Sequence, residues 1–392
     1  MNSIPFNLSL FMHVFYRAFC DGIGPSKLPS PLRRLTLLVL AFGWMMLVLV
    51  HKIFFRLDQL FFPGLVNLEI KDPLFVVGVP RSGTTFLHRL LVEDSERFTS
   101  IQLWEIIFAP SILQKLFYLG LARIDKLLGA PLAAIFRWLG QRLSNPLAGI
   151  HQTGLFDAEE DEYLHAWSFS TVFLVEHFPY YDLAGHYAYF DEDVQSSERN
   201  ALMDYYLGCV RRHMWVFGRG RRFLAKNPAL CGKGNSFHEI FPDAQLILMV
   251  RTPLETIPSY LSLLEAWRSG VYIPADRLSQ VVEGALSILD HFNRYPLEMV
   301  DTIYEHQSRI VLYSDLLGEL ESVVNSIYQD LGVSPSPAFV EKLHVQAERS
   351  RSYRSTHQYS LAKYGLTHQQ IINRYSYVFE RFGFSIQCEV VK

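Results

Sequence analysis

The sequence has 392 residues, of which 49% are hydrophobic, 14% aromatic and 19% charged, and its net charge is −3. A charged share this far below about 25% excludes an intrinsically disordered chain and a charged coiled coil. Because 36 Lys and Arg residues face 39 Asp and Glu residues, we do not expect a nucleic-acid-binding protein. Four isolated cysteines argue against a disulfide scaffold and fit a reducing compartment.

The first predicted element is a hydrophobic helix over residues 35–50, which carry no charge; two arginines precede the run and Lys52 follows it. At about 1.5 Å per residue this helix spans about 24 Å, less than a bilayer core of about 30 Å. It predicts a membrane anchor or an interfacial helix. A helix packed on the rest of the chain and a cleaved signal peptide are the alternatives. We therefore divide the chain into a membrane-associated region, 1–69, and a larger domain, 70–392.

A second apolar stretch covers residues 106–143, where Gly120, Gly129 and Pro131 predict two or three short helices. Its charged residues are mostly basic. Such helices either lie on an anionic membrane or form an insert, at about 106–150, that covers the active site with its basic face in solvent. The charged residues are Lys115, Arg123, Asp125, Lys126, Arg137 and Arg142.

From residue 73 onward, short apolar runs alternate with helical patterns. This alternation predicts an α/β fold in which helices cover both faces of a central parallel sheet. The runs expected to form strands are 74–79, 221–226, 244–250 and 309–313.

The loop PRSGTT, residues 80–85, joins the run 74–79 to a predicted helix. The N–H groups and the dipole at a helix N-terminus favour an anion, and Gly83 lets the backbone approach it closely. The segment therefore predicts an anion-binding loop. A cation and hydroxyl donors are supplied by Arg81, Ser82, Thr84 and Thr85.

The loop has the glycine spacing of a Walker A motif, but Thr84 stands where its lysine would be. An NTPase of that class also needs a carboxylate that holds Mg²⁺. The expected partner strand, 244–250, ends instead in Arg251. A cation there predicts that the loop binds its anion without a metal. Sulfuryl transfer suits this arrangement, since a sulfuryl group carries less charge than a phosphoryl group.

On these motifs the sequence resembles the sulfotransferase superfamily that uses 3′-phosphoadenosine 5′-phosphosulfate (PAPS). PRSGTT resembles its 5′-phosphosulfate loop, and RTPLETIPSYLSL (251–263) resembles its 3′-phosphate segment. The similarity, over roughly residues 58–385, is to bacterial sulfotransferases distantly related to tyrosylprotein sulfotransferases. It implies a P-loop-like three-layer fold. Further matches are LDQLFFPG (57–64), QLWE (102–105), EEDEYL (159–164), AKNPAL (225–230), LYSDLL (312–317) and RSYRSTHQYSLAKYGLT (351–367).

The resemblance also implies roles for individual residues. Glu105 is predicted to be the base that deprotonates the acceptor, although a glutamate there could also cap a helix. Lys226 and Arg81 are predicted to stabilise the bridging and sulfuryl oxygens. Arg251 and Ser259 are predicted to bind the 3′-phosphate.

Three further site residues come from the same resemblance. Tyr313 is expected near the phosphates of the nucleotide, and Arg351 and Arg354 in a C-terminal segment that folds over it. Pro258, just before Ser259, predicts a bent or late-starting helix.

The acidic run 157–162 is predicted to start a helix and to lie mostly in solvent. One of its carboxylates is an alternative base or substrate contact, and His151 and His165 are weaker candidates. The run has no metal-ligand spacing with histidine.

The sequence thus predicts a metal-independent, PAPS-dependent sulfotransferase at the membrane, acting on a small-molecule or lipid-like hydroxyl acceptor. A bacterial origin would put its catalytic domain in the cytoplasm, and a eukaryotic one in the Golgi lumen. The alternatives are a nucleotide-binding protein without transferase activity and a P-loop kinase.

Overall fold

The computed structural model describes residues 3–21, 30–131, 154–268, 278–352 and 360–385. Within them, five parallel strands form one sheet in the order β2-β3-β1-β4-β5. The predicted parallel α/β fold is therefore confirmed. The strands are β1 (Leu74–Val77), β2 (Phe98–Thr99), β3 (Arg222–Lys226), β4 (Gln245–Val250) and β5 (Ser308–Leu312).

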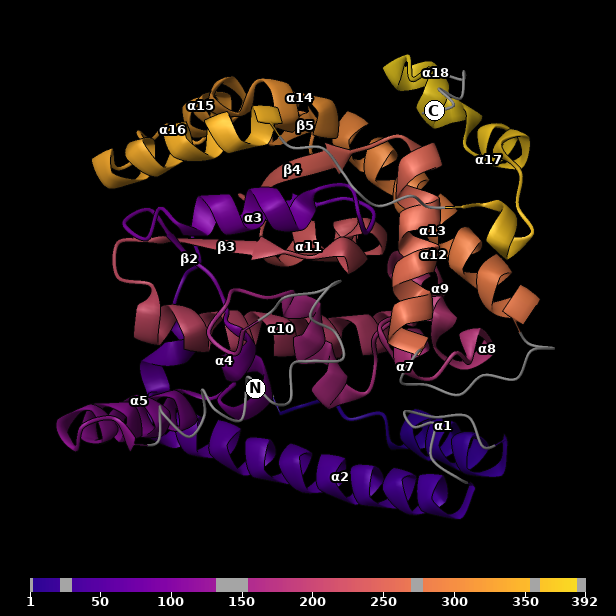
Figure 1. Ribbon diagram of the computed structural model, residues 1–392. Helices are drawn as coiled ribbons and strands as arrows, with labels where there is room; N and C mark the ends of the chain where they lie inside the picture. The colour runs from indigo at the N-terminus through magenta and orange to yellow at the C-terminus, as the bar shows by residue number, and fades with distance from the viewer. Residues whose placement is uncertain (1–2, 22–29, 132–153, 269–277, 353–359, 386–392) are drawn as a thin grey trace.

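Strand β1 is buried on both faces, as the uninterrupted run of apolar residues predicts. Leu74 and Val76 pack with the helices α3 (Thr84–Val92), α14 (Tyr313–Gly318), α15 (Leu320–Asp330) and α16 (Pro337–Ser352). Phe75 and Val77 face the opposite layer, which contains α10 (Ser196–Phe217), α11 (Gly234–Ile240) and α13 (Leu278–Asp301). Figure 1 shows these layers on either side of the sheet.

Three N-terminal helices form a further layer below α10 in Figure 1. They are α1 (Leu8–Asp21), α2 (Ser30–Phe61) and α5 (Ile112–Leu127), and α2 contacts both of the others. Of the described helices, α2 alone is long and apolar enough to cross a membrane. It is twice as long as the predicted run 35–50.

Of the other described helical segments, α12 (Pro253–Arg268) has 16 residues and the rest have at most eight. The rest are η1 (Pro63–Asn67), α4 (Leu103–Phe108), η2 (Asp161–Ser168), α7 (Leu174–His177), α8 (Tyr181–Ala184), η3 (Gly185–Tyr189), α9 (Phe190–Asp193), η4 (Pro228–Gly232), η6 (Ala362–Tyr364), α17 (His368–Arg374) and α18 (Ser376–Phe382).

The predicted insert differs from expectation in two ways. Gly120 lies inside α5 and does not end it, because a helix tolerates one glycine at a cost of about 1 kcal/mol. Lys115 does not lie on a solvated basic face, because its side chain is 2% exposed and pairs with Glu105. The rest of the insert, residues 132–153, lies outside the described residues.

The described part of residues 1–69 shares a hydrophobic core with the larger domain. Ile4, Leu37 and Phe55 belong to the same buried cluster as Phe75 and Tyr205. The N-terminal region is therefore packed on the α/β domain, and the predicted boundary at 69/70 does not separate two cores.

Candidate active site

The loop after β1 has the backbone of a tight anion-binding turn. Gly78, Arg81 and Gly83 have φ angles of 148°, 73° and 100°. A Cβ atom on Gly78 would lie 2.5 Å from the carbonyl oxygen of Met249, so only glycine fits between the two strands. Arg81 holds a left-handed conformation that L-residues rarely adopt, which is common at functional sites.

Helix α3 starts directly after the loop, with Gly83 at its N-cap. The first N–H groups of a helix lack intrahelical partners and attract an anion. Ser82 is fully buried, and its hydroxyl has no hydrogen-bond partner within the described residues. An orphaned donor inside the loop fits an anion such as a 5′-phosphosulfate, which would supply the missing acceptor.

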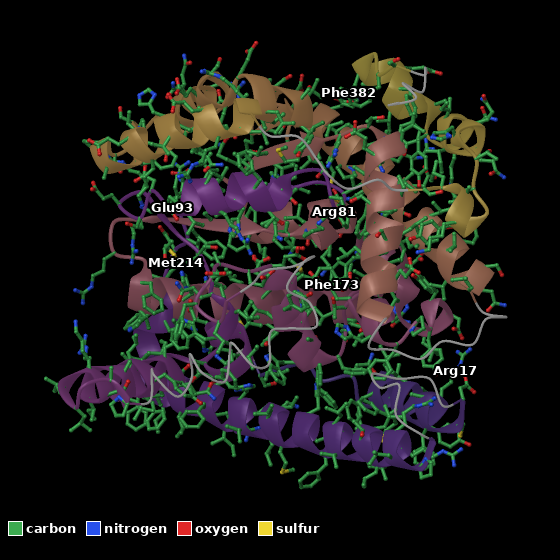
Figure 2. The ribbon with its side chains drawn as sticks, in the orientation of Figure 1. Arg17, Arg81, Glu93, Phe173, Met214 and Phe382 are labelled. Atoms are coloured by element: carbon green, nitrogen blue, oxygen red, sulfur yellow. The ribbon has the colours of Figure 1, made fainter. Side chains whose placement is uncertain are left out.

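Arg81 connects the loop to the segment predicted to bind a 3′-phosphate. Its Nε donates to the Ser259 hydroxyl at 3.0 Å, and its carbonyl oxygen accepts from Nη1 of Arg251 at 3.1 Å. Arg81 lies near the centre of the view in Figure 2. Three predicted ligands of one nucleotide therefore lie together at the carboxyl ends of β1 and β4.

Tyr313 lies against the same loop. The Arg251 guanidinium stacks on its ring, with 4.1 Å between the guanidinium carbon and the ring centre. A Cβ atom on Gly83 would lie 2.6 Å from the ring. The ring therefore covers the loop at the end of β5, where the sequence places it.

Lys226 ends β3 and reaches the start of α3. Its Nζ donates to the Thr85 hydroxyl at 3.0 Å and to Oε1 of Glu160. The Lys226 side chain is 2% exposed, whereas that of Glu160 is 15% exposed. A cation and a carboxylate that solvent can reach thus meet at the mouth of the loop.

Glu105, the predicted base, is placed differently. Its Oε1 accepts from the backbone N–H of Gln102 at 3.0 Å, which completes a capping box on α4. Its Oε2 accepts from His213 at 2.8 Å and lies 3.4 Å from Lys115. Burial opposes its ionisation, but His213 and Lys115 together hold the pKa of Glu105 below its ordinary value. Both oxygens are thus engaged inside the fold, and the capping alternative describes this residue.

Most of the acidic run does not lie in solvent, which corrects that prediction, although Asp157 at its start is exposed. Glu159, Asp161 and Glu162 are at most 5% exposed. Glu162 forms a fully buried ion pair with Lys233, 2.6 Å away. The buried ammonium group of Lys233 offsets the cost of burying the Glu162 carboxylate. The sequence analysis does not predict this ion pair.

Two buried carboxyl groups near Glu160 have raised pKa values. Burial raises the pKa of Asp161 to about 7. Burial, with repulsion from Glu160, raises the pKa of Glu176 to about 8. At neutral pH Glu176 is therefore mostly protonated, whereas Asp161 is close to its midpoint.

The other predicted site residues have separate outcomes. Helix α12 starts at Pro253 and contains Pro258, so Ser259 lies in its second turn and the helix does not start late. Arg351 is exposed in the last turn of α16, and its role stays a prediction. Arg354 and His151 lie outside the described residues. His165 is buried against Tyr206, away from solvent.

A parallel sheet with an anion-binding loop and three cations at its carboxyl edge defines the P-loop-like class of α/β proteins. Within that class, the chain belongs to the sulfotransferase family, whose model matches residues 73–337. It is 26% identical over 332 residues to omega-hydroxy-beta-dihydromenaquinone-9 sulfotransferase Stf3 of Mycobacterium bovis. That match covers 80% of this chain and 75% of the relative.

Two solved structures share the fold. Sulfotransferase STF9 from Mycobacterium avium has a TM-score of 0.73 and 17% identity, and the match covers 98% of each chain. Sulfotransferase STF1 from Mycobacterium tuberculosis H37Rv has a TM-score of 0.67 and 22% identity, with 94% of this chain and 92% of that chain covered.

Proposed function

We propose that this sulfotransferase moves a sulfuryl group from PAPS to the hydroxyl group of a lipid-like acceptor, with Glu160 as the general base. The observation that carries the proposal is the Glu160–Lys226–Thr85 contact at the mouth of the loop. It would supply a base and a cation together at the mouth of the loop.

In this reaction the acceptor oxygen attacks the sulfur, and the bond from sulfur to the 5′-phosphate oxygen breaks. The acceptor proton passes to Glu160. Lys226 and Arg81 stabilise the negative charge that grows on the bridging and sulfuryl oxygens. The products are a sulfate ester and 3′-phosphoadenosine 5′-phosphate.

The ammonium group of Lys226 can pair with Glu160 or with an anion bound in the loop. In the structure it pairs with Glu160. A donor anion in the loop would compete for the ammonium group and leave the carboxylate free to accept a proton. Arg251 and Ser259 would hold the 3′-phosphate, a handle whose binding energy positions the reacting centre.

The base is tested by comparing Glu160→Gln with Glu105→Gln. We expect Glu160→Gln to lower kcat by about 10²–10⁴-fold, because proton transfer by a positioned base contributes that much. Its affinity for 3′-phosphoadenosine 5′-phosphate should be unchanged, as measured by calorimetry.

The matched variant Glu105→Gln should keep kcat within about tenfold but lower the unfolding free energy by about 3 kcal/mol, because it leaves Lys115 buried without its partner. The assignment of the base fails if Glu105→Gln loses turnover and Glu160→Gln keeps it.

The sulfotransfer donor is tested by ligand binding. The chain should bind 3′-phosphoadenosine 5′-phosphate more tightly than AMP, and Arg251→Ala should abolish that preference. Equal affinity for the two nucleotides would favour a nucleotide-binding protein without this activity. A requirement for Mg²⁺ and ATP would favour a kinase. Activity that survives EDTA would exclude the kinase alternative.

The lipid-like acceptor is supported by two observations. The relative Stf3 is named for an omega-hydroxy-beta-dihydromenaquinone-9 acceptor. In this chain, helices beside the α/β domain expose large apolar side chains. Incubation of lipid extracts with radiolabelled PAPS should label a species that partitions into organic solvent. Labelling of sugars or peptides alone would contradict this acceptor class.

A further inference from the structure

We propose that helices α1, α2 and α5 form one face that inserts in the plane of an anionic membrane surface, and that α2 does not cross the bilayer. The three helices form one layer of the molecule (Figure 1). Each exposes large apolar side chains that a water-soluble surface seldom presents together. Examples are Met12, Phe42, Met46, Phe117, Leu121 and Leu127, which are 38% to 86% exposed.

Helix α2 is held on the domain along its length. Leu37, Val48, His51, Phe55 and Asp58 recur at intervals of three to eleven residues and are at most 3% exposed. They form one buried stripe, while the other sides of the helix stay apolar and exposed. A helix that crossed the bilayer would have to withdraw this stripe from its partners.

Two polar contacts raise the cost of such a withdrawal. The carboxylate of Asp58 accepts from Nε of Arg212 on α10 at 2.9 Å and from the backbone N–H groups at the start of α5. His51 contacts the side chain of Gln114 on α5. Separating α2 would leave Arg212, which is 1% exposed, without its counter-charge.

Trp44 adds an aromatic contact at the middle of α2. Its ring lies 5.4 Å from that of Trp167 and 5.8 Å from that of Phe169. The helix is therefore held from Leu37 to Asp58, with its long axis along the surface of the domain. This geometry is that of an interfacial helix, which buries one side in the headgroup region.

The charges of the face identify a lipid surface as its partner. Arg34, Arg56, Arg123 and Lys126 are exposed on α2 and α5. Among the described residues of the three helices, Asp21 is the one exposed carboxylate, since Asp58 and Asp125 are buried. Basic side chains around an apolar face suit anionic headgroups. A second copy of the chain would set like charges against each other.

The proposal is tested by flotation of the full-length protein with vesicles of phosphatidylcholine alone or in an equimolar mixture with phosphatidylglycerol. We expect binding to the mixed vesicles, weaker binding to the neutral ones, and release by alkaline carbonate. The double variants Phe42→Glu/Met46→Glu and Phe117→Glu/Leu121→Glu should each lower the partition coefficient by about tenfold or more, because each removes two apolar side chains from the lipid.

The matched control is Val333→Glu/Val345→Glu, two exposed valines near α15 and α16 on the far side of the sheet. It should bind vesicles like the parent chain. Thermal melting and binding of 3′-phosphoadenosine 5′-phosphate report folding in every variant, independently of turnover.

Three outcomes would overturn the proposal. Resistance to carbonate, with normal binding by the α5 variant, would show that α2 spans the bilayer. Absence of vesicle binding, with dimers that dissociate in the α2 variant, would show that the face joins two copies. Loss of vesicle binding in the control variant would show that membrane binding does not depend on the face formed by α1, α2 and α5.

Discussion

Two lysines near the loop pair with carboxylates in different surroundings. Lys233 and Glu162 are both 0% exposed, so their ion pair is closed to substrate. Lys226 is also buried, at 2% exposure, but its partner Glu160 is 15% exposed. Lys226 can therefore exchange this carboxylate for another anion. The closed pair is a structural contact, and the open pair is where we expect proton and charge transfer.

Asp161 provides a pH test at the scale of one residue. Burial raises its pKa from 3.8 to about 7, so the folded chain holds a proton that the unfolded chain has lost. The stability from that proton is complete below about pH 4 and is lost as the pH rises through 7.

Asp161→Asn still accepts from Tyr206 but cannot ionise. We expect the variant to gain unfolding free energy relative to the parent chain between pH 5 and pH 8, by about 2–3 kcal/mol. Urea titrations at the two pH values measure this difference. An equal effect at both values would mean that Asp161 is ionised in the folded state.

At the scale of elements, the site is built where β1, β3, β4 and β5 end. Each strand delivers one residue or segment to the same edge: the loop, Lys226, Arg251 and Tyr313. The carboxyl ends of parallel strands share one edge of the sheet, so the order of strands brings these side chains together. This convergence could be predicted from strand-end residues alone.

Gly83 tests the close packing of loop and ring. Gly83→Ala would place a methyl group 2.6 Å from the Tyr313 ring at a φ angle of 100°. We expect affinity for 3′-phosphoadenosine 5′-phosphate to fall by about tenfold or more, with a loss of stability of about 1–3 kcal/mol.

The control is Gly120→Ala in α5, where no described atom beyond the adjacent residues and the nearby helix backbone lies within 4 Å of the new methyl group. It should leave affinity unchanged and stabilise the helix by about 0.5–1 kcal/mol. Calorimetry and thermal melting measure both quantities. Unchanged affinity in Gly83→Ala would show that the packing of the Tyr313 ring on the loop does not contribute to nucleotide binding.

At the scale of the whole molecule, the N-terminal layer is part of the core. Phe55 is fully buried between Tyr205 and the guanidinium of Arg212, whose centre lies 4.0 Å from its ring. Stability of the α/β domain should therefore depend on α2, although α2 precedes every motif of the site.

Phe55→Ala should lower the unfolding free energy of the entire chain by about 3–5 kcal/mol, because it leaves a cavity in the shared core. Phe42 lies on the same helix and is 67% exposed. Phe42→Ala should change the unfolding free energy by less than about 0.5 kcal/mol in detergent-free buffer. Chemical denaturation followed by fluorescence measures both. Two separate transitions would show that residues 1–69 and the larger domain unfold independently.

The parallel sheet and the anion-binding loop follow from local sequence patterns. Buried strands appear as continuous apolar runs, and a glycine-bearing turn before a helix has a local physical cause that no distant residue changes. The positions of Lys226, Arg251 and Ser259 followed from the same local patterns and a family resemblance.

Long-range packing, which no local pattern reveals, places Glu160 beside Lys226. Both glutamates pair with a lysine, Glu105 with Lys115 and Glu160 with Lys226, and the second pair joins residues that lie 66 positions apart in the chain. Long-range packing also decided that α2 lies along the domain, because a hydrophobic run is equally stable in a bilayer and in a protein core. The buried stripe from Leu37 to Asp58 shows which side of the helix the protein covers.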